Sequence, residues 1–167
     1  MSLLDALLGR TPPTGTEAQA LAACLDAPLW VASVLDGAPY PDVETLLEQA
    51  DAAARALPPE AVLVALQTHP RIGERPSGDS AHERMSRLEQ SGVSQDAETR
   101  ERLAAGNAAY EARFGHVFLI RAAGLSQEEV LAALDERLGN DAATELLVAA
   151  DQLRQIALLR LQAALAA

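Results

Sequence analysis

A histidine followed directly by a proline is the first feature of this sequence that could do chemistry. His69 and Pro70 end an amphipathic run in the stretch QTHPRIGERPSG. Proline disfavours helical geometry for the residue before it, so we expect the helix to stop here and to leave the imidazole among backbone carbonyls that favour a cation. Imidazole also titrates near neutral pH and can transfer protons. On position alone, a histidine that only caps the helix is the simpler interpretation.

A second polar group lies in the stretch SRLEQ. Ser86, Glu89 and Gln90 are spaced i, i+3 and i+4, so a helix would project all three from one face. A hydroxyl, a carboxylate and an amide can together donate and accept several directed hydrogen bonds. The same stripe is common on surface helices, so the pattern predicts a binding face only if other residues converge on it.

Two arginines near the C-terminus are the third feature. Arg160 is surrounded in sequence by isoleucine and leucine, whereas Arg154 has the polar neighbours Asp151, Gln152 and Gln155. An arginine in apolar company either keeps its head group in water while its stem is buried, or binds a planar anion inside a cleft. Arg154 is more typical of a surface position.

Other classes of site find no support in the sequence. His69, His82 and His116 lack the spacing of zinc ligands, and no nucleophile-elbow, Walker or Rossmann motif is present. Cys24 is the single cysteine and lies on the apolar side of a helical run, so we expect it to be a small core residue. Metal, nucleotide and hydride chemistry are therefore not predicted.

The elements that must position these residues read as helices along the whole chain. Asp42 should cap one helix, and Ser126 with Glu129 forms a capping box for another. Residues 116–124, HVFLIRAAG, favour a strand but are too isolated to form a sheet. The helices are expected over residues 1–9, 16–27, 28–37, 43–57, 58–69, 82–92, 94–115, 127–139 and 142–167.

Composition agrees with one all-α domain of about eight helices over residues 1–167. Hydrophobic residues make up 49% of the chain but aromatic residues only 3%, so leucine, alanine and valine must build the core. A net charge of −11 argues against a nucleic-acid partner. No apolar stretch is long enough to span a membrane, and no basic signal peptide is present, so we expect a cytoplasmic protein.

Taken in order, several blocks resemble the OHCU decarboxylase family of urate breakdown, where OHCU is 2-oxo-4-hydroxy-4-carboxy-5-ureidoimidazoline. The resemblance runs from about residue 17 to residue 165, while DAPLW and the loop ERPSGDSAHERMS depart from the family's pattern. It implies an all-α homodimer that needs neither metal nor organic cofactor and that converts OHCU to (S)-allantoin and CO2. It also implies a functional link to 5-hydroxyisourate hydrolase, and the arginine- and alanine-rich composition suits a bacterium. The matching blocks are LWVASVLDGAPYPDVETLL, HPRIGE, SRLEQSGV, YEARFGHVFLIRAAG, LDERLGNDAATEL and QIALLRL.

The resemblance also implies roles for particular residues. His69 and Glu89 match the family's catalytic positions, and Arg160 matches an arginine of the terminal block, with Arg154 as the alternative if the register differs. The substrate-binding positions, the last two of them acting partly through backbone groups, are Pro70, Ser86, Gln90, Phe118 and Ile120.

The predicted chemistry follows from these roles. The substrate's conjugated ring would hold the electrons left behind by CO2, so no organic cofactor is needed. His69 would deprotonate the substrate hydroxyl or protonate the carbon, while Glu89 and Gln90 hold N–H groups and Arg160 binds anionic oxygens. Two alternatives remain open, namely a non-enzymatic helical interaction module and a decarboxylase of a related ureido acid.

Overall fold

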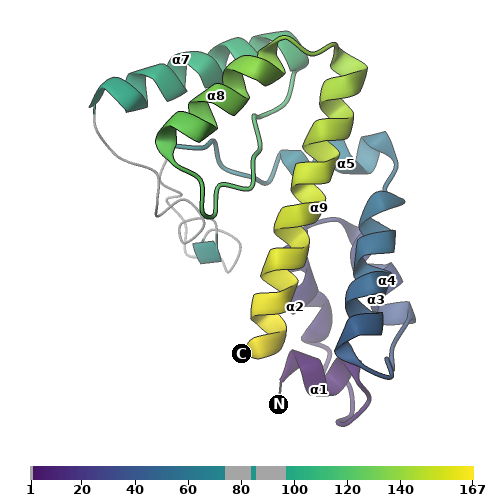
Figure 1. Cartoon of the computed structure of the whole chain (residues 1–167). Coiled ribbons are helices and arrows are strands. Elements are labelled where there is room, and N and C mark those ends of the chain that lie inside the picture. The colour runs from purple at the N-terminus through teal and green to yellow at the C-terminus, as the bar shows by residue number, and fades with distance from the viewer. Residues whose placement is uncertain (1, 74–83, 86–96) are drawn as a thin grey trace. The chain divides into compact units, whose positions relative to one another are not determined.

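The computed structural model describes residues 2–73, 84–85 and 97–167. These residues form helices and contain no strand, as the sequence predicts. The eight helices with defined bounds are α1 (Leu3–Leu7), α2 (Glu17–Cys24), α3 (Pro28–Asp36), α4 (Val43–Arg55), α5 (Pro59–Leu66), α7 (Ala97–Phe114), α8 (Gln127–Leu138) and α9 (Ala142–Ala166). Figure 1 shows them in chain order, from purple to yellow.

Local signals place most helix ends where the sequence predicts them. The Asp42 side chain accepts a hydrogen bond from the backbone N–H of Thr45 at the start of α4, and Ser126 with Glu129 forms the expected capping box of α8. Proline occupies the first turn of α3, where its missing N–H costs nothing. The predicted end of α5 is wrong by three residues, because the helix stops at Leu66 and a turn leads to His69.

The chain divides into two compact units. The first contains the residues up to Ala65 together with Arg154–Ala167. Within it, α3 packs against both α2 and α4, and the indole N–H of Trp30 donates a hydrogen bond of 2.9 Å to the carbonyl of Ala50. Its core is aliphatic apart from that indole and Tyr40, and it includes Cys24, which is buried as predicted.

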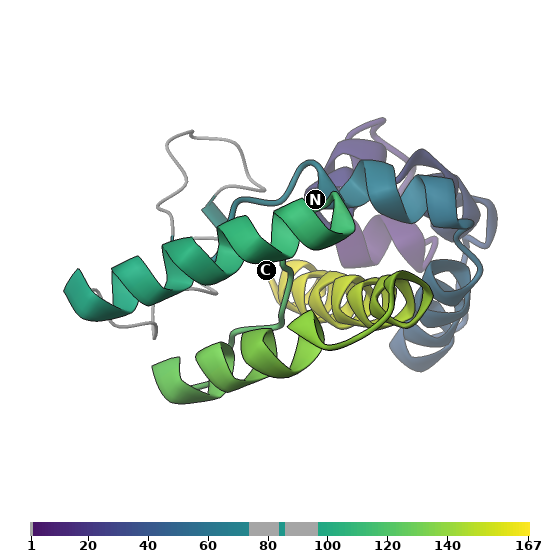
Figure 2. The same ribbon diagram turned by 90° about the horizontal axis from the view of Figure 1, so that it is seen from above.

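The second unit contains Leu66–Leu153. Helices α7 and α8 lie side by side in it, and residues 115–126 lead back from the end of α7 to the start of α8 (Figure 1, Figure 2). A Cβ at Gly106 would lie 2.3 Å from Leu134, so the absence of a side chain there lets the two helices approach closely. The buried residues of its core cluster are Ile72, Leu103, Tyr110, Phe118, Ala122, Val130, Leu131 and Leu134.

Candidate active site

The histidine of the HPRIG stretch is buried just beyond α5. His69 is only 6% exposed, and its backbone N–H donates to the carbonyl of Leu66 at 3.2 Å. This bond closes the turn that the following proline requires, since Pro70 disfavours a helical conformation at His69. The side chain is therefore placed by a turn and not by the last turn of the helix itself.

The residues after the histidine fasten this turn to α7. Arg71 forms a two-point ion pair with Glu111, at 2.5 Å from Nε and 2.9 Å from Nη2. The buried Asn107 amide donates to the carbonyl of Ile72 at 3.0 Å. Gly73 has a positive φ of 88°, which favours glycine, and an added Cβ would lie 3.1 Å from Leu103. The loop downstream of His69 is thus bound to α7 at two successive residues, Arg71 and Ile72.

The SRLEQ stripe cannot be placed. Ser86, Glu89 and Gln90 lie outside the described residues, as does His82. Their common helix face and the proposed roles of the three stripe residues remain predictions from the sequence.

The two residues predicted from the HVFLIRAAG block have different environments. Phe118 is 1% exposed, and its ring lies edge-on to that of Tyr110 with the centroids 5.3 Å apart. Ile120 is half-buried and packs against the same core cluster. The side chain of Phe118 therefore belongs to the core of the second unit, whereas Ile120 keeps partial access to solvent.

The two candidate arginines belong to the first unit and differ in their surroundings. Arg160 is 3% exposed, so the apolar company seen in the sequence does lead to burial. Burial raises the pKa of the nearby Cys24 thiol to about 11, an effect that the positive charge of Arg160 partly opposes. Arg154 lies 2.5 Å from a carboxylate oxygen of Asp51, and hydrogen bonds from Arg55 and then Arg154 hold the pKa of that carboxyl below its usual range. Arg154 therefore forms an ion pair with Asp51 of the same unit.

A buried polar network in the second unit was not assigned any role from the sequence. Arg137 is 6% exposed and Glu145 fully buried, and the guanidinium donates to this carboxylate from Nε at 2.8 Å and Nη2 at 2.6 Å. The Tyr110 hydroxyl donates to Glu145 as well, and the Asn140 amide does so at 2.9 Å. Burial, and then the hydrogen bond to Glu145, raise the pKa of Tyr110 above its usual range. In the sequence, Arg137, Asn140 and Glu145 lie in the matching block LDERLGNDAATEL, and Tyr110 begins the block YEARFGHVFLIRAAG.

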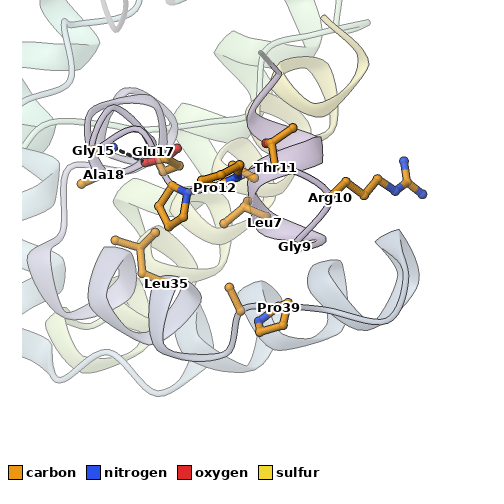
Figure 3. Close-up of a pocket in the computed structure, with 13 residues that line it drawn as sticks. Leu7, Gly9, Arg10, Thr11, Pro12, Gly15, Glu17, Ala18, Leu35 and Pro39 are labelled. Carbon is orange, nitrogen blue, oxygen red and sulfur yellow. Dashed lines mark hydrogen bonds between the residues drawn. The ribbon is translucent and has the colours of Figure 1, made fainter.

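Two cavities accompany these groups, one in each unit. The cavity in the second unit has a volume of about 220 Å³ and is lined by Arg71–Gly73 and one face of α7. The cavity in the first unit measures about 720 Å³, and Leu7, Pro12, Leu35 and Pro39 line it (Figure 3). No predicted site residue is among the described residues that line the larger one.

Among the described residues, no group of three or more histidine, cysteine or acidic side chains could hold a metal ion. No helix in this part of the chain is long and apolar enough to cross a membrane.

Comparison with known proteins gives one family and two curated relatives. Residues 11–162 match the family model of OHCU decarboxylase. The 2-oxo-4-hydroxy-4-carboxy-5-ureidoimidazoline decarboxylase of Amia calva is 33% identical over 138 residues, which are 81% of this chain and 79% of that protein. The uric acid degradation bifunctional protein TTL of Arabidopsis thaliana is 35% identical over 103 residues, 59% of this chain. The aligned part is only 32% of the plant protein.

Solved structures share the fold. An OHCU decarboxylase crystallised in the presence of (S)-allantoin superposes with a TM-score of 0.74 at 24% identity, covering 87% of this chain and 96% of that one. An (S)-allantoin synthase superposes with a TM-score of 0.71 at 23% identity, covering 98% of this chain and 54% of that one. Both likenesses bear out the all-α architecture.

Proposed function

Because this chain belongs to the OHCU decarboxylase family, a family of carboxy-lyases, we propose that it converts OHCU to (S)-allantoin and CO2 in urate breakdown. The observation that carries the proposal is the match to the family model over residues 11–162, a range that contains every predicted site residue. Family membership was predicted from the ordered sequence blocks and is confirmed. The match across both compact units also supports treating the chain as a single functional domain.

In this proposal His69 moves the proton. Breaking the bond between the substrate carbon and its carboxylate releases CO2 and leaves an electron pair, which the conjugated imidazoline ring accepts. A proton then reaches the neighbouring ring carbon, which bears the ureido group, from one face and fixes the (S) configuration, while the hydroxyl on the decarboxylated carbon loses its proton and becomes a ring carbonyl. The burial of His69 limits exchange with bulk water, and the bonds of Arg71 and Ile72 to α7 restrain the turn that carries it.

Substrate recognition falls to the polar residues of the other blocks. Glu89, with Ser86 and Gln90 on the same predicted helix face, would bind ring or ureido N–H groups and select the face that is protonated. Pro70 and Ile120 would complete the binding site. Carboxylate and amide oxygens are suitable acceptors for such N–H groups.

Arg160 would bind the anionic oxygens of the substrate. Its guanidinium is buried, and a planar fork of donors suits a carboxylate better than a lysine would. The contact between Arg154 and Asp51 supports the choice of Arg160 over Arg154, because a carboxylate of the protein already occupies Arg154.

The biological setting is a further part of the proposal. We infer a homodimer, from the family resemblance alone, and a cytoplasmic, bacterial location, from composition. The functional link with 5-hydroxyisourate hydrolase rests on the family resemblance alone. No metal or organic cofactor is assigned a role.

The test is a stereochemical assay. OHCU is generated in situ from urate with urate oxidase and 5-hydroxyisourate hydrolase, the protein is added, and circular dichroism follows the product. Faster decay of OHCU with accumulation of (S)-allantoin is expected. Racemic allantoin appearing at the spontaneous rate would remove the proposed function and favour an interaction module, whereas turnover of another ureido acid alone would point to a changed substrate.

A further inference from the structure

The segment between α7 and α8 has a backbone that neither helix nor sheet satisfies. Residues 115–126 are non-helical and pair with no strand among the described residues. Buried peptide groups without partners are costly, so side chains or a ligand must bind those that water does not reach. The distribution of these hydrogen bonds shows which part of the segment is fixed.

Two side chains bind the backbone on either side of one residue. Arg137 of α8 donates from Nη1 to the carbonyl of Leu119 at 2.6 Å, and Gln152 of α9 accepts from the N–H of Arg121 at 2.9 Å. The residue between them is Ile120. We call these two contacts the backbone clamp.

The arginine of the clamp is itself immobilised. Its remaining donors bind Glu145 at 2.8 and 2.6 Å, and its guanidinium lies 4.6 Å from the centroid of the Phe118 ring. Charge-assisted bonds of this kind in a buried site fix both position and orientation. Leu119 is therefore held by a rigid group, and the network that holds Arg137 acts on the segment through it.

Ile120 is left with its peptide groups uncommitted. Among the described residues, neither its N–H nor its carbonyl has a hydrogen-bond partner, and the residue is half-buried. A donor and an acceptor on one residue match a ureido or cyclic amide group, which presents an N–H beside a carbonyl.

We propose that Arg137 and Gln152 are positioning residues, whose backbone clamp holds the Ile120 peptide groups in place to bind the amide edge of the substrate. This inference rests on the proposed function, because it names the part of the substrate that this segment recognises. The clamp lowers the entropy lost when the substrate binds, because the segment is ordered in advance. Neither residue touches the substrate.

Gln152 gives the sharper test, since it is half-buried on α9 and its replacement leaves the ion pair between Arg137 and Glu145 intact. Gln152→Met keeps the length of the side chain but removes the acceptor, whereas Gln152→Glu keeps an acceptor oxygen. Leu147→Ala, at a position that is 74% exposed on the same helix, is the matched control. KM and kcat for OHCU are measured in high salt, which screens the charge added by glutamate.

Loss of one ordering hydrogen bond predicts an approximately 3- to 10-fold rise in KM for Gln152→Met with kcat within about 2-fold. Gln152→Glu should restore KM, and Leu147→Ala should match the wild type. An unchanged KM in Gln152→Met, or a glutamate variant as defective as the methionine variant, would overturn the inference.

A binding measurement separates this inference from the proposed function. Calorimetry with (S)-allantoin needs no turnover, and Kd should rise by the same approximate 3- to 10-fold in Gln152→Met. A wild-type protein that binds allantoin in this clamp-dependent way but does not consume OHCU would refute the proposed function alone. A wild-type Kd in Gln152→Met would refute the clamp, whatever the activity.

Discussion

The two units of this protein bury their ionisable groups in different ways. The second unit encloses an arginine, a glutamate and a tyrosine, and Arg137 finds its partners Glu145 and Leu119 inside that unit. The first unit holds its carboxylates in local caps and an ion pair: Glu17, which is 8% exposed, and Asp42 bind nearby backbone N–H groups, and the partly exposed Asp51 binds Arg154. The one arginine that it buries, Arg160, adjoins leucines and the Cys24 thiol.

This difference separates an arginine that builds the fold from one suited to bind substrate. A buried guanidinium whose donors are taken by a carboxylate and a carbonyl is committed to structure. Burial also strengthens the attraction of a guanidinium for an anion, because the dielectric constant is low, and this suits Arg160 to a substrate carboxylate. Substitution of Arg137 should therefore lower the stability of the protein, whereas substitution of Arg160 should lower its catalytic activity.

The largest effect is expected on stability when the network of the second unit is broken. Arg137→Leu leaves Glu145 charged, buried and without its guanidinium, and the free energy of unfolding should fall by about 3–5 kcal/mol. Urea denaturation measures the change. Arg102→Leu, at an exposed position of α7, should stay within about 0.5 kcal/mol of the wild type.

A double variant makes this prediction sharper. Arg137→Leu with Glu145→Leu removes both charges and should recover most of the stability lost by the single variant. A single variant as stable as the wild type would mean that the network does not hold the second unit together.

The next effect is expected on catalysis in the first unit. Arg160→Met should lower kcat/KM for OHCU by about 100-fold, the value of a strong hydrogen bond between charged groups. Arg154→Met is the matched control, and it should stay within about 3-fold because Asp51 and not substrate occupies that guanidinium. A large loss of kcat/KM in the Arg154 variant alone would mean that Arg154, and not Arg160, binds the substrate.

Sequence reasoning recovered the elements governed by local rules. The caps at Asp42 and Ser126 were predictable because each depends on residues within one helical turn. The apolar sequence neighbours of Arg160 indicated that its stem is buried, but they left open whether its head group stays in water. These features need no knowledge of which segments meet in space.

Features that depend on distant segments were missed. Arg137 stands near the end of a helix in the stretch DERLGN, where a basic residue is ordinarily solvated. Its burial arises from Glu145 on the next helix and from Tyr110 on the previous one, and no local pattern reports either contact. The end of α5 was predicted three residues too late. Pro70 prevents the helix from continuing past His69, but it does not determine how many residues earlier the helix ends.

The smallest effect is expected at a carboxylate of the first unit that binds only nearby backbone and hydroxyl groups. Glu17 accepts hydrogen bonds from the backbone N–H groups of Thr14 and Gly15 and from the Thr14 hydroxyl. These bonds, the one from the Thr14 backbone foremost, lower the pKa of Glu17 from 4.5 to about 2. A carboxyl with a lowered pKa contributes stability above its unfolded pKa, and the contribution disappears as the pH falls through the folded value.

Glu17→Gln should therefore lower Tm slightly at pH 7, and the difference from the wild type should vanish between pH 4.5 and about pH 2. Thermal melts across this range provide the measurement. A difference that grows on acidification would contradict the role given to the hydrogen bonds of Glu17.

The most direct test of the central claim, that His69 carries out the proton transfer of a stereoselective decarboxylation, is the turnover of OHCU by His69→Asn. Asparagine keeps a polar side chain of similar size but cannot exchange a proton near neutral pH. With far-ultraviolet circular dichroism and Tm like those of the wild type, kcat should fall by about 10²- to 10⁴-fold, the usual value of a positioned acid or base. A folded variant that forms (S)-allantoin at the wild-type rate would contradict the account.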